Sequence, residues 1–274
     1  MNDIIYADNK VYIKNAMNFD LAQTLDCGQA FRWSEDGNGV WRGMAGGRYI
    51  ELYKSGNDIV IENTSEKDFK SFWAEYFDID RDYSAIIEGF GANETLKKAA
   101  AAASGIRILK QEPWEALCSF IISQNNNIPR IKGIIERLCE NFGEKGFKMY
   151  TFPSAETLAP LSPDDLAVIR SGFRAKYIID AARRVAAGEI DLAALKTLSY
   201  DDAQRELLKI KGVGPKVADC ALLYGCGRIE AFPKDVWIKR ALNEFFGGEI
   251  PDCAKSAAGI AQQYIFYYIR ESSK

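Results

Sequence analysis

The sequence predicts an α+β protein in which an N-terminal antiparallel β-sheet packs against a larger all-helical body. Short runs rich in β-branched and aromatic residues fill the first third of the chain, broken by the turn sequences DGNG, GG and SGND. From about Ser65 the apolar residues recur at helical spacing instead. With 274 residues, of which 47% are hydrophobic, the chain can bury a sizeable core, and we expect a sheet domain over residues 1–100 and a helical domain over residues 101–274.

Each expected element carries its own local signal. Proline opens two helices, at Pro113 before WEALCSFIIS and at Pro129 before a helix with one apolar face. Ser162 with Asp165 forms a capping box for a third helix, and Ser199 opens a fourth. The expected strands are the runs VYIKN (11–15), AFRWSE (30–35), VWRGMAG (40–46), RYIELYK (48–54) and DIVIEN (58–63).

The composition restricts the chemistry that the chain can perform. It contains no histidine, which removes the Ser/His and Cys/His nucleophile pairs and the commonest metal ligand. Any chemistry must therefore use carboxylates, lysine, cysteine or tyrosine. The net charge of −3 argues weakly against a nucleic-acid partner, but the excess of Asp and Glu lies in residues 1–100, and residues 101–274 are slightly basic.

Cysteine usage and hydropathy indicate the compartment. The six cysteines form no CxxC pair, so we expect reduced, buried thiols and neither a zinc site nor an iron–sulfur cluster. The N-terminus shows no basic and apolar leader, and no apolar run approaches the roughly 18 residues of a membrane span. We therefore expect a cytoplasmic protein, nucleoid-associated if bacterial.

The segment KIKGVGPKVADC (209–220) predicts a helix-hairpin-helix unit over residues 199–225. A capped helix precedes the segment, and Pro215 opens the next helix. The turn Gly212-Val213-Gly214 can direct backbone N–H groups at one DNA phosphate without reading a base. A purely structural turn is the alternative.

Lys216, Cys220 and Asp235 are the candidate chemical groups. Lys216 lies in the first turn of the second helix, where the macrodipole disfavours a cation, and Cys220 follows at i+4 on the same face. A catalytic lysine must be destabilised as a cation before it can attack an electrophilic carbon and form an imine. The alternatives are that Lys216 grips a phosphate and that Asp235 is an N-cap, worth about 1 kcal/mol. The cap and a catalytic role are compatible, because a capping carboxylate stays ionised and fixed in direction.

These residues closely resemble the helix-hairpin-helix base-excision DNA glycosylases that carry both a catalytic lysine and a catalytic aspartate, and more narrowly the 8-oxoguanine DNA glycosylase/AP lyases. The resemblance implies excision of 8-oxoguanine opposite cytosine from duplex DNA through a Schiff base, followed by strand cleavage by β-elimination. It continues in the segments LDCGQAFRW (25–33), YFDID (76–80), SFIISQNNNIPRIKGIIERLC (119–139), SGFRAKY (171–177) and GIAQQYIF (259–266).

The resemblance implies a role for each matching position of the active site. Lys216 would be the nucleophile at sugar C1′, and Asp235 would stabilise the developing oxocarbenium. The flipped base would lie between Cys220 and Phe266, with Gln262 on its Watson–Crick edge. The sequence independently places Gln262 and Phe266 at i,i+4 on one helical face.

Two further backbone features follow from the resemblance. Gly28 would offer its carbonyl to the N7 hydrogen that 8-oxoguanine has and guanine lacks, which discriminates because a buried unpaired acceptor is costly. A simple turn glycine is the alternative. Pro233 belongs to the implied substrate pocket. The chemistry needs no metal or organic cofactor, but a structural monovalent cation is implied on the carbonyls of Leu208, Ile210 and Val213.

The remaining implied residues contact the duplex. Asn125, the first of three asparagines that break a helical pattern, would fill the hole left by the extruded base. Arg130 and Arg174 would read the orphaned cytosine while Phe173 wedges the base stack; for both arginines a solvated surface charge is the alternative. Trp237 stands where eukaryotic members have a phosphate-contacting histidine, so this contact depends on the indole N–H, and Phe173 replaces a tyrosine.

Two other functions compete with this interpretation. Glycosylases of the superfamily that act on other damaged purines, such as alkylated bases, generally lack the lysine. A non-catalytic helix-hairpin-helix DNA-binding protein would bind phosphate without needing Asp235 beside Lys216. We expect a monomer whose partner is double-stranded DNA containing 8-oxoguanine, with no membrane association.

Overall fold

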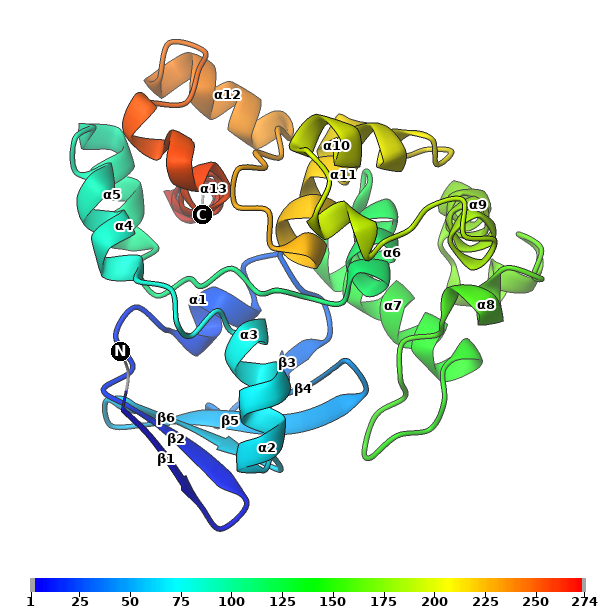
Figure 1. Cartoon of the computed structure of the whole chain (residues 1–274), viewed down its shortest axis with the longest axis horizontal. Helices are drawn as coiled ribbons and strands as arrows, with labels where there is room; N and C mark the ends of the chain where they lie inside the picture. The colour runs from blue at the N-terminus through cyan, green and yellow to red at the C-terminus, as the bar shows by residue number, and fades with distance from the viewer. Residues whose placement is uncertain (1–2, 273–274) are drawn as a thin grey trace.

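The computed structural model describes residues 3–272 and shows an antiparallel sheet joined to a larger helical body (Figure 1). The sheet has six strands in the order β1-β2-β6-β5-β4-β3, and every neighbouring pair is antiparallel. The expected α+β architecture is confirmed. The strands are β1 (Asp3–Ala7), β2 (Lys10–Lys14), β3 (Trp33–Glu35), β4 (Trp41–Ala45), β5 (Arg48–Ser55) and β6 (Asp58–Glu62).

The run AFRWSE was expected to be a strand throughout, and this is wrong for its first half. Only Trp33–Glu35 pairs with the sheet, because the residues before it turn toward the helical body. There Phe31 packs edge-on against Phe120 with ring centroids 5.8 Å apart, and Arg32 lies 3.5 Å from the carboxylate of Glu115. Strand β1 lies outside the expected runs.

Short helices α2 (Glu66–Asp68) and α3 (Ala74–Tyr76) cover one face of the sheet (Figure 1). Between them, residues 69–73 form a turn of π-helix. Trp33 donates from Nε1 to the hydroxyl of Tyr76 at 2.9 Å, and Trp73 stacks on Phe77 at 5.6 Å. These aromatic contacts form the sheet-side core.

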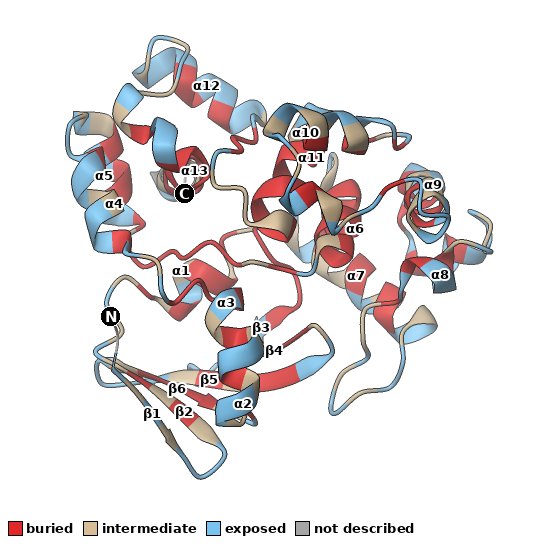
Figure 2. Cartoon of the chain, in the orientation of Figure 1, coloured by how far each residue is buried: buried red, intermediate tan, exposed pale blue. Residues whose placement is uncertain are grey.

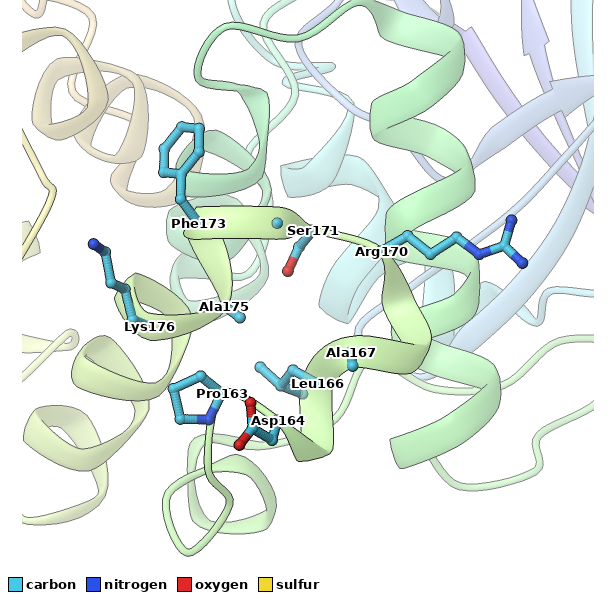
Figure 3. A pocket seen from close by; sticks show the side chains of 10 residues that line it. Pro163, Asp164, Leu166, Ala167, Arg170, Ser171, Phe173, Ala175 and Lys176 are labelled. Carbon is cyan, nitrogen blue, oxygen red and sulfur yellow. The ribbon is translucent and has the colours of Figure 1, made fainter.

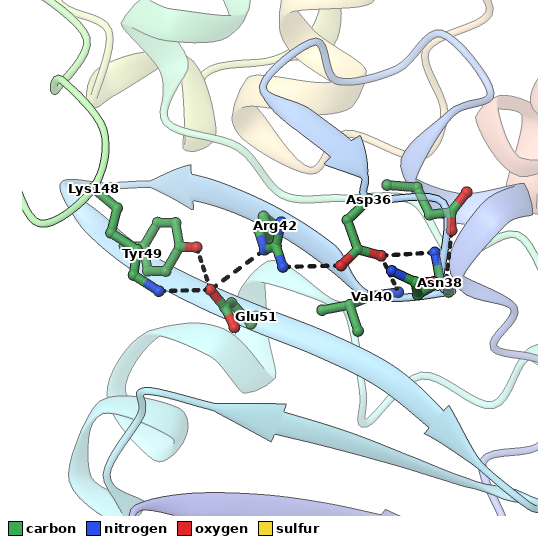
Figure 4. A network of polar contacts seen from close by, with 9 residues as sticks. Asp36, Asn38, Val40, Arg42, Tyr49, Glu51 and Lys148 are labelled. Atoms are coloured by element: carbon green, nitrogen blue, oxygen red, sulfur yellow. Dashed lines mark hydrogen bonds and ion pairs between the residues drawn. The ribbon is translucent and has the colours of Figure 1, made fainter.

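A polar network joins the sheet to a loop of the helical body (Figure 4). The carboxylate of Glu51 on β5 accepts from the Tyr49 hydroxyl at 2.6 Å and from Lys148 at 2.9 Å. These two hydrogen bonds lower the pKa of Glu51. Arg42 on β4 extends the network, at 3.4 Å from Glu51 and 2.9 Å from Asp36.

The helical body begins with elements from the first hundred residues. Phe90 of α4 (Tyr83–Phe90) packs edge-on against Tyr264 of α13 (Ala258–Ser272) at 6.0 Å, and Leu96 of α5 (Glu94–Ala102) is buried in the same core. Residues 103–112 then pass between the sheet and the helical body (Figure 1). Residues on both sides of residue 100 contribute to the helical core. The predicted division of the chain into two domains at that residue stays a prediction. The other helices are α1 (Leu21–Leu25), α4 (Tyr83–Phe90), α5 (Glu94–Ala102), α6 (Pro113–Ser123), α7 (Ile128–Phe142), α8 (Ala155–Leu158), α9 (Ala175–Ala186), α10 (Tyr200–Leu208), α11 (Pro215–Cys220), α12 (Val236–Phe245) and α13 (Ala258–Ser272).

The local helix signals are confirmed with one change. Pro113 is the first residue of α6, and Ser199 caps α10 by accepting from the Asp202 N–H at 3.2 Å. The Ser162 capping box also forms, since the Asp165 carboxylate accepts from the Ser162 N–H at 2.8 Å. It opens a 3-10 helix over Asp165–Ile169 instead of the expected α-helix.

Buried residues gather along the inward faces of the helices, and the outer face of α12 is exposed (Figure 2). Within residues 3–272, no helix has both the length and the apolar character needed to cross a membrane.

Candidate active site

The hairpin between α10 and α11 is held in shape by α9. Gly212 has φ +81°, and a Cβ there would lie 2.4 Å from the ring of Tyr177. The carboxylate of Asp180 accepts from the Lys211 N–H at 2.8 Å. Only glycine satisfies both the backbone angle and this contact at position 212.

The expectation that all three residues Gly212, Val213 and Gly214 present N–H groups is corrected at one position. The Val213 N–H donates to the Ile210 carbonyl at 3.1 Å and so is used inside the turn. Gly214, in an extended conformation, is the N-cap of α11 and has no side chain to accept a capping bond. The N–H groups at the start of a helix have no partner within that helix. The remaining candidates for anion binding at this hairpin are therefore the N–H groups of Gly212, Gly214 and the first turn of α11.

Lys216 and Cys220 lie one turn apart on α11, as the spacing predicts. Lys216 is half-buried, with its ammonium 5.2 Å from the ring centroid of Phe120 on α6. Cys220 is 3% exposed. Burial raises the pKa of the Cys220 thiol to about 11, and the nearby Lys216 ammonium opposes that rise. The thiol is therefore neutral at pH 7 and can pack against an uncharged base.

Asp235 caps α12 and lies within electrostatic reach of α11. Its Oδ1 accepts from the Ile238 N–H at 2.8 Å, which is the expected N-cap bond. Its negative charge contributes to the raised pKa of Cys220, so the carboxylate lies within electrostatic reach of that thiol. Pro233, two residues earlier, is buried. The candidate chemical groups are thus Lys216 in the first turn of α11, Cys220 at the end of α11 and Asp235 at the start of α12.

The residues expected to bind the base come from opposite ends of the chain. Gly28 has φ +89°, and a Cβ there would lie 3.9 Å from the ring of Phe266 and 3.3 Å from Ile128. Gln262 is 5% exposed, and its Oε1 has no hydrogen-bond partner within the described residues. A buried acceptor without a partner is costly, so this oxygen is suited to a ligand that donates a hydrogen bond.

Three residues that the sequence did not predict connect the residues around Lys216 to the residues expected to bind the base. Phe120, below the Lys216 ammonium, stacks on Tyr224 with ring centroids 5.1 Å apart. The Tyr224 hydroxyl donates to Gln263 at 2.5 Å, and Gln263 donates to the carbonyl of Cys27 at 3.2 Å. Phe120 and Tyr224 look like ordinary core aromatics in the sequence, and no local signal distinguishes them.

Four of the expected DNA-contacting residues are exposed. Asn125 has φ +46° in the loop between α6 and α7, and Arg130 follows on the first turns of α7. Phe173 and Trp237 are 50% and 47% exposed. Arg174 differs from them because it is only 3% exposed and donates to backbone carbonyls of the protein.

A surface cavity of about 460 Å³ lies beside the Phe173 turn (Figure 3). Leu166 and Ala175 line it, and the Phe173 ring points away from it. Ser171 is 1% exposed, and its Oγ has no hydrogen-bond partner within the described residues. The residues that line the cavity do not include Lys216, Cys220 or Asp235, so the cavity is separate from those candidate groups.

A hairpin of the kind expected to bind a DNA phosphate, followed by a lysine and a capping carboxylate, is typical of enzymes of the base-excision class that act on DNA. Residues 11–117 match the family model of the 8-oxoguanine DNA glycosylase N-terminal domain, and residues 118–257 match that of the HhH-GPD superfamily base excision DNA repair proteins. The chain belongs to the HhH-GPD superfamily of base excision DNA repair proteins.

Individual relatives are similar over most of the chain. The N-glycosylase/DNA lyase of Saccharomyces cerevisiae is 30% identical over 262 residues, which cover 82% of this chain and 68% of the yeast protein. The structure of MBOgg1 in complex with a low-affinity DNA ligand is 41% identical, with a TM-score of 0.93 over 100% of both chains. The Clostridium acetobutylicum 8-oxoguanine glycosylase/lyase, solved with double-stranded DNA containing cytosine opposite 8-oxoG, is 39% identical; its TM-score is 0.93, over 100% of this chain and 99% of that one.

Proposed function

We propose that this protein excises 8-oxoguanine from duplex DNA and then cleaves the strand at the resulting abasic site. One observation carries the proposal: half-buried Lys216 lies one turn before Cys220 on the helix that directly follows the hairpin, and Asp235 caps α12. The similarity to a yeast N-glycosylase/DNA lyase and to a bacterial 8-oxoguanine glycosylase/lyase supports it.

Lys216 supplies the nucleophile. Its neutral amine attacks C1′, the bond from C1′ to the base breaks, and the electron pair leaves with the base. The departing base takes one proton from the attacking amine. The bond from C1′ to O4′ then breaks, O4′ takes the second amine proton, and the electron pair on nitrogen forms the imine between Lys216 and C1′. The imine makes the C2′ hydrogen acidic, so loss of that proton expels the 3′ phosphate by β-elimination.

Asp235 stabilises the positive charge that develops on the sugar. The cap bond from Ile238 at 2.8 Å fixes the direction of the carboxylate before the substrate arrives. A charge that is already oriented stabilises the transition state without reorganisation. This catalytic role and the cap role therefore use the same geometry.

Gln262, Gly28, Cys220 and Phe266 form the base pocket. The unpaired Oε1 of Gln262 accepts a hydrogen from the Watson–Crick edge of the base, which carries N–H donors. The Gly28 carbonyl accepts the N7 hydrogen of 8-oxoguanine, and guanine would leave that acceptor unpaired. A Cβ at Gly28 would lie 3.9 Å from the Phe266 ring, and this proximity supports the assignment of both residues to one pocket.

The hairpin carbonyls fit a structural cation. Helix α10 ends at Leu208, where the last carbonyls of a helix have no internal donor, and the Ile210 carbonyl accepts a single bond at 3.1 Å. Carbonyl oxygens are ligands that hard cations accept. Leu208, Ile210 and Val213 would hold the ion, which would rigidify the turn.

We expect from the sequence that the active form is a monomer. From the sequence we place the protein in the cytoplasm, at the nucleoid if the source is bacterial.

Borohydride trapping tests the proposed mechanism. The parent protein, incubated with an 8-oxoguanine:cytosine duplex and borohydride, should form a covalent adduct through Lys216. Lys216→Gln should lose the adduct and base excision but retain lesion binding, because the variant removes the nucleophile and keeps the pocket. Lys211→Gln is the matched control, since Lys211 is an exposed lysine of the same hairpin. Adduct formation by Lys216→Gln at the parent level would refute the assignment.

A further inference from the structure

The turn that carries Gly28 is held by a glutamine side chain on each side. Gln263 of α13 donates from Nε2 to the Cys27 carbonyl at 3.2 Å, and Gln111 donates from Nε2 to the Gln29 carbonyl at 2.6 Å. Both glutamines are buried. Gly28 has φ +89°, and glycine by itself adopts many backbone conformations. The two glutamines therefore tie down the peptide groups before and after the one that contains the Gly28 carbonyl.

Tyr224 is bonded to both glutamines. Its hydroxyl donates to Oε1 of Gln263 at 2.5 Å, and its carbonyl accepts from the Gln111 N–H at 2.6 Å. Burial raises the pKa of the Tyr224 hydroxyl well above its usual value, so the hydroxyl stays protonated and remains a donor. This bond also orients the Gln263 amide, because a flipped amide would place its oxygen against the Cys27 carbonyl, and both of those atoms are acceptors.

The Tyr224 ring connects the two glutamines to the nucleophile. It stacks on Phe120 with ring centroids 5.1 Å apart and an angle of 18° between the planes. The centroid of the Phe120 ring lies 5.2 Å from the Lys216 ammonium. Direct contacts through Phe120, Tyr224 and Gln263 therefore join the lysine to the turn that carries Gly28.

We propose that Gln263 is a positioning residue for lesion recognition, which sets the Gly28 carbonyl to accept the N7 hydrogen of 8-oxoguanine, and that Tyr224 holds Gln263 in the orientation this requires. The inference rests on the proposed function, which assigns the N7 hydrogen to the Gly28 carbonyl. A hydrogen bond weakens steeply as its geometry departs from linear, so a carbonyl released by loss of Gln263 discriminates less between 8-oxoguanine and guanine. A side chain that only stabilised the fold would affect every duplex equally.

Duplex binding by variants made in the Lys216→Gln background tests the inference, because Lys216→Gln is expected to bind the lesion without excising it. The duplexes carry 8-oxoguanine, 8-bromoguanine or guanine opposite cytosine. 8-Bromoguanine fills the C8 position but has a lone pair at N7 in place of the hydrogen. Gln263→Leu, which removes both polar atoms of the amide, should lower the ratio of 8-oxoguanine to 8-bromoguanine affinity about tenfold. Affinity for the other two duplexes should change less than about threefold.

Two further variants separate positioning from stability. Tyr224→Phe removes the hydroxyl and keeps the ring on Phe120, so it should lower the same affinity ratio. It should add little in the Gln263→Leu background, because residues that act through one another are not additive. Tyr264→Phe is the matched control: it removes a buried hydroxyl of the same helix, which donates to the Ile106 carbonyl at 3.3 Å, and it should leave the ratio unchanged.

Each outcome supports or overturns the inference. An unchanged ratio in Gln263→Leu, or equal losses of affinity for 8-oxoguanine and 8-bromoguanine, would overturn the positioning role, and so would an equal fall of the ratio in Tyr264→Phe. If Gln263→Leu does not fold, Tyr224→Phe decides: a lowered ratio supports the inference and an unchanged ratio overturns it. If Lys216→Gln alone binds the three duplexes equally, the base pocket of the proposed function fails instead.

Discussion

Substitution of Asp235 separates its capping role from its catalytic role. In the parent protein, Asp235 accepts from the Ile238 N–H at 2.8 Å. Asp235→Asn keeps a side-chain oxygen that can accept this bond, and asparagine caps helices as well as aspartate does. What the variant loses is the negative charge. Asp235→Ala loses both the charge and the cap.

The expected magnitudes differ between stability and rate. Loss of the charge at the α12 N-terminus costs about 0.3–1 kcal/mol, and loss of the cap in Asp235→Ala costs about 1 kcal/mol more. For a chain of this size, 1 kcal/mol corresponds to a Tm change of about 2–4 °C. Loss of an oriented group that stabilises transition-state charge slows reactions roughly 100- to 1,000-fold. Asp235→Asn should therefore melt close to the parent and react far more slowly.

Thermal melting followed by circular dichroism and single-turnover excision on an 8-oxoguanine:cytosine duplex measure the two effects. Asp82→Asn is the control, because Asp82 caps α4 with an equivalent bond to the Ala85 N–H at 3.0 Å. It should match Asp235→Asn in melting and the parent in rate. An excision rate for Asp235→Asn within about threefold of the parent would refute the electrostatic role. Lost helicity in that variant would show that the cap dominates.

Three further predictions follow from the site. Gln262→Ala should weaken binding of a lesion duplex by about 1–3 kcal/mol and leave binding of undamaged duplex unchanged, as measured by titration of both; equal losses would place Gln262 in the core only. Arg130→Ala should reduce the cytosine-over-adenine preference by about one to two decades, mainly through faster excision opposite adenine; an unchanged ratio would make Arg130 a surface charge. Gly212→Ala should lower Tm and weaken binding to any duplex, because a Cβ there would lie 2.4 Å from the Tyr177 ring; parent-like melting and binding would show that the turn accommodates it.

The sequence was most informative where a residue and its partner lie within a few positions of each other. The Ser199 cap, the Pro113 start and the Asp235 cap all form as predicted, since each involves an N–H two or three residues away or the fixed φ of proline. The change from alternating to helical periodicity of the apolar residues also predicted the α+β class correctly, because strands and helices repeat their buried positions at different spacings.

Local rules failed where a long-range contact competes with them. The residues before Trp33 have strand-forming character, but their side chains contact the helical body instead of extending the sheet. Phe31 packs against Phe120, and Arg32 pairs with Glu115. Val213 has the expected place in the hairpin, and a bond within the turn uses its N–H.

The sequence by itself determined the antiparallel sheet, the helix starts, the hairpin and the i,i+4 relation of Lys216 and Cys220. Only the tertiary structure decided that Asp235 lies within electrostatic reach of Cys220, that Gly28 lies close to Phe266 from the other end of the chain, and that Arg174 is buried. The physical reason is the distance along the sequence over which each kind of interaction acts. Helix and turn geometry fixes neighbours within about four residues, whereas contacts between distant residues depend on how the side chains of whole elements pack.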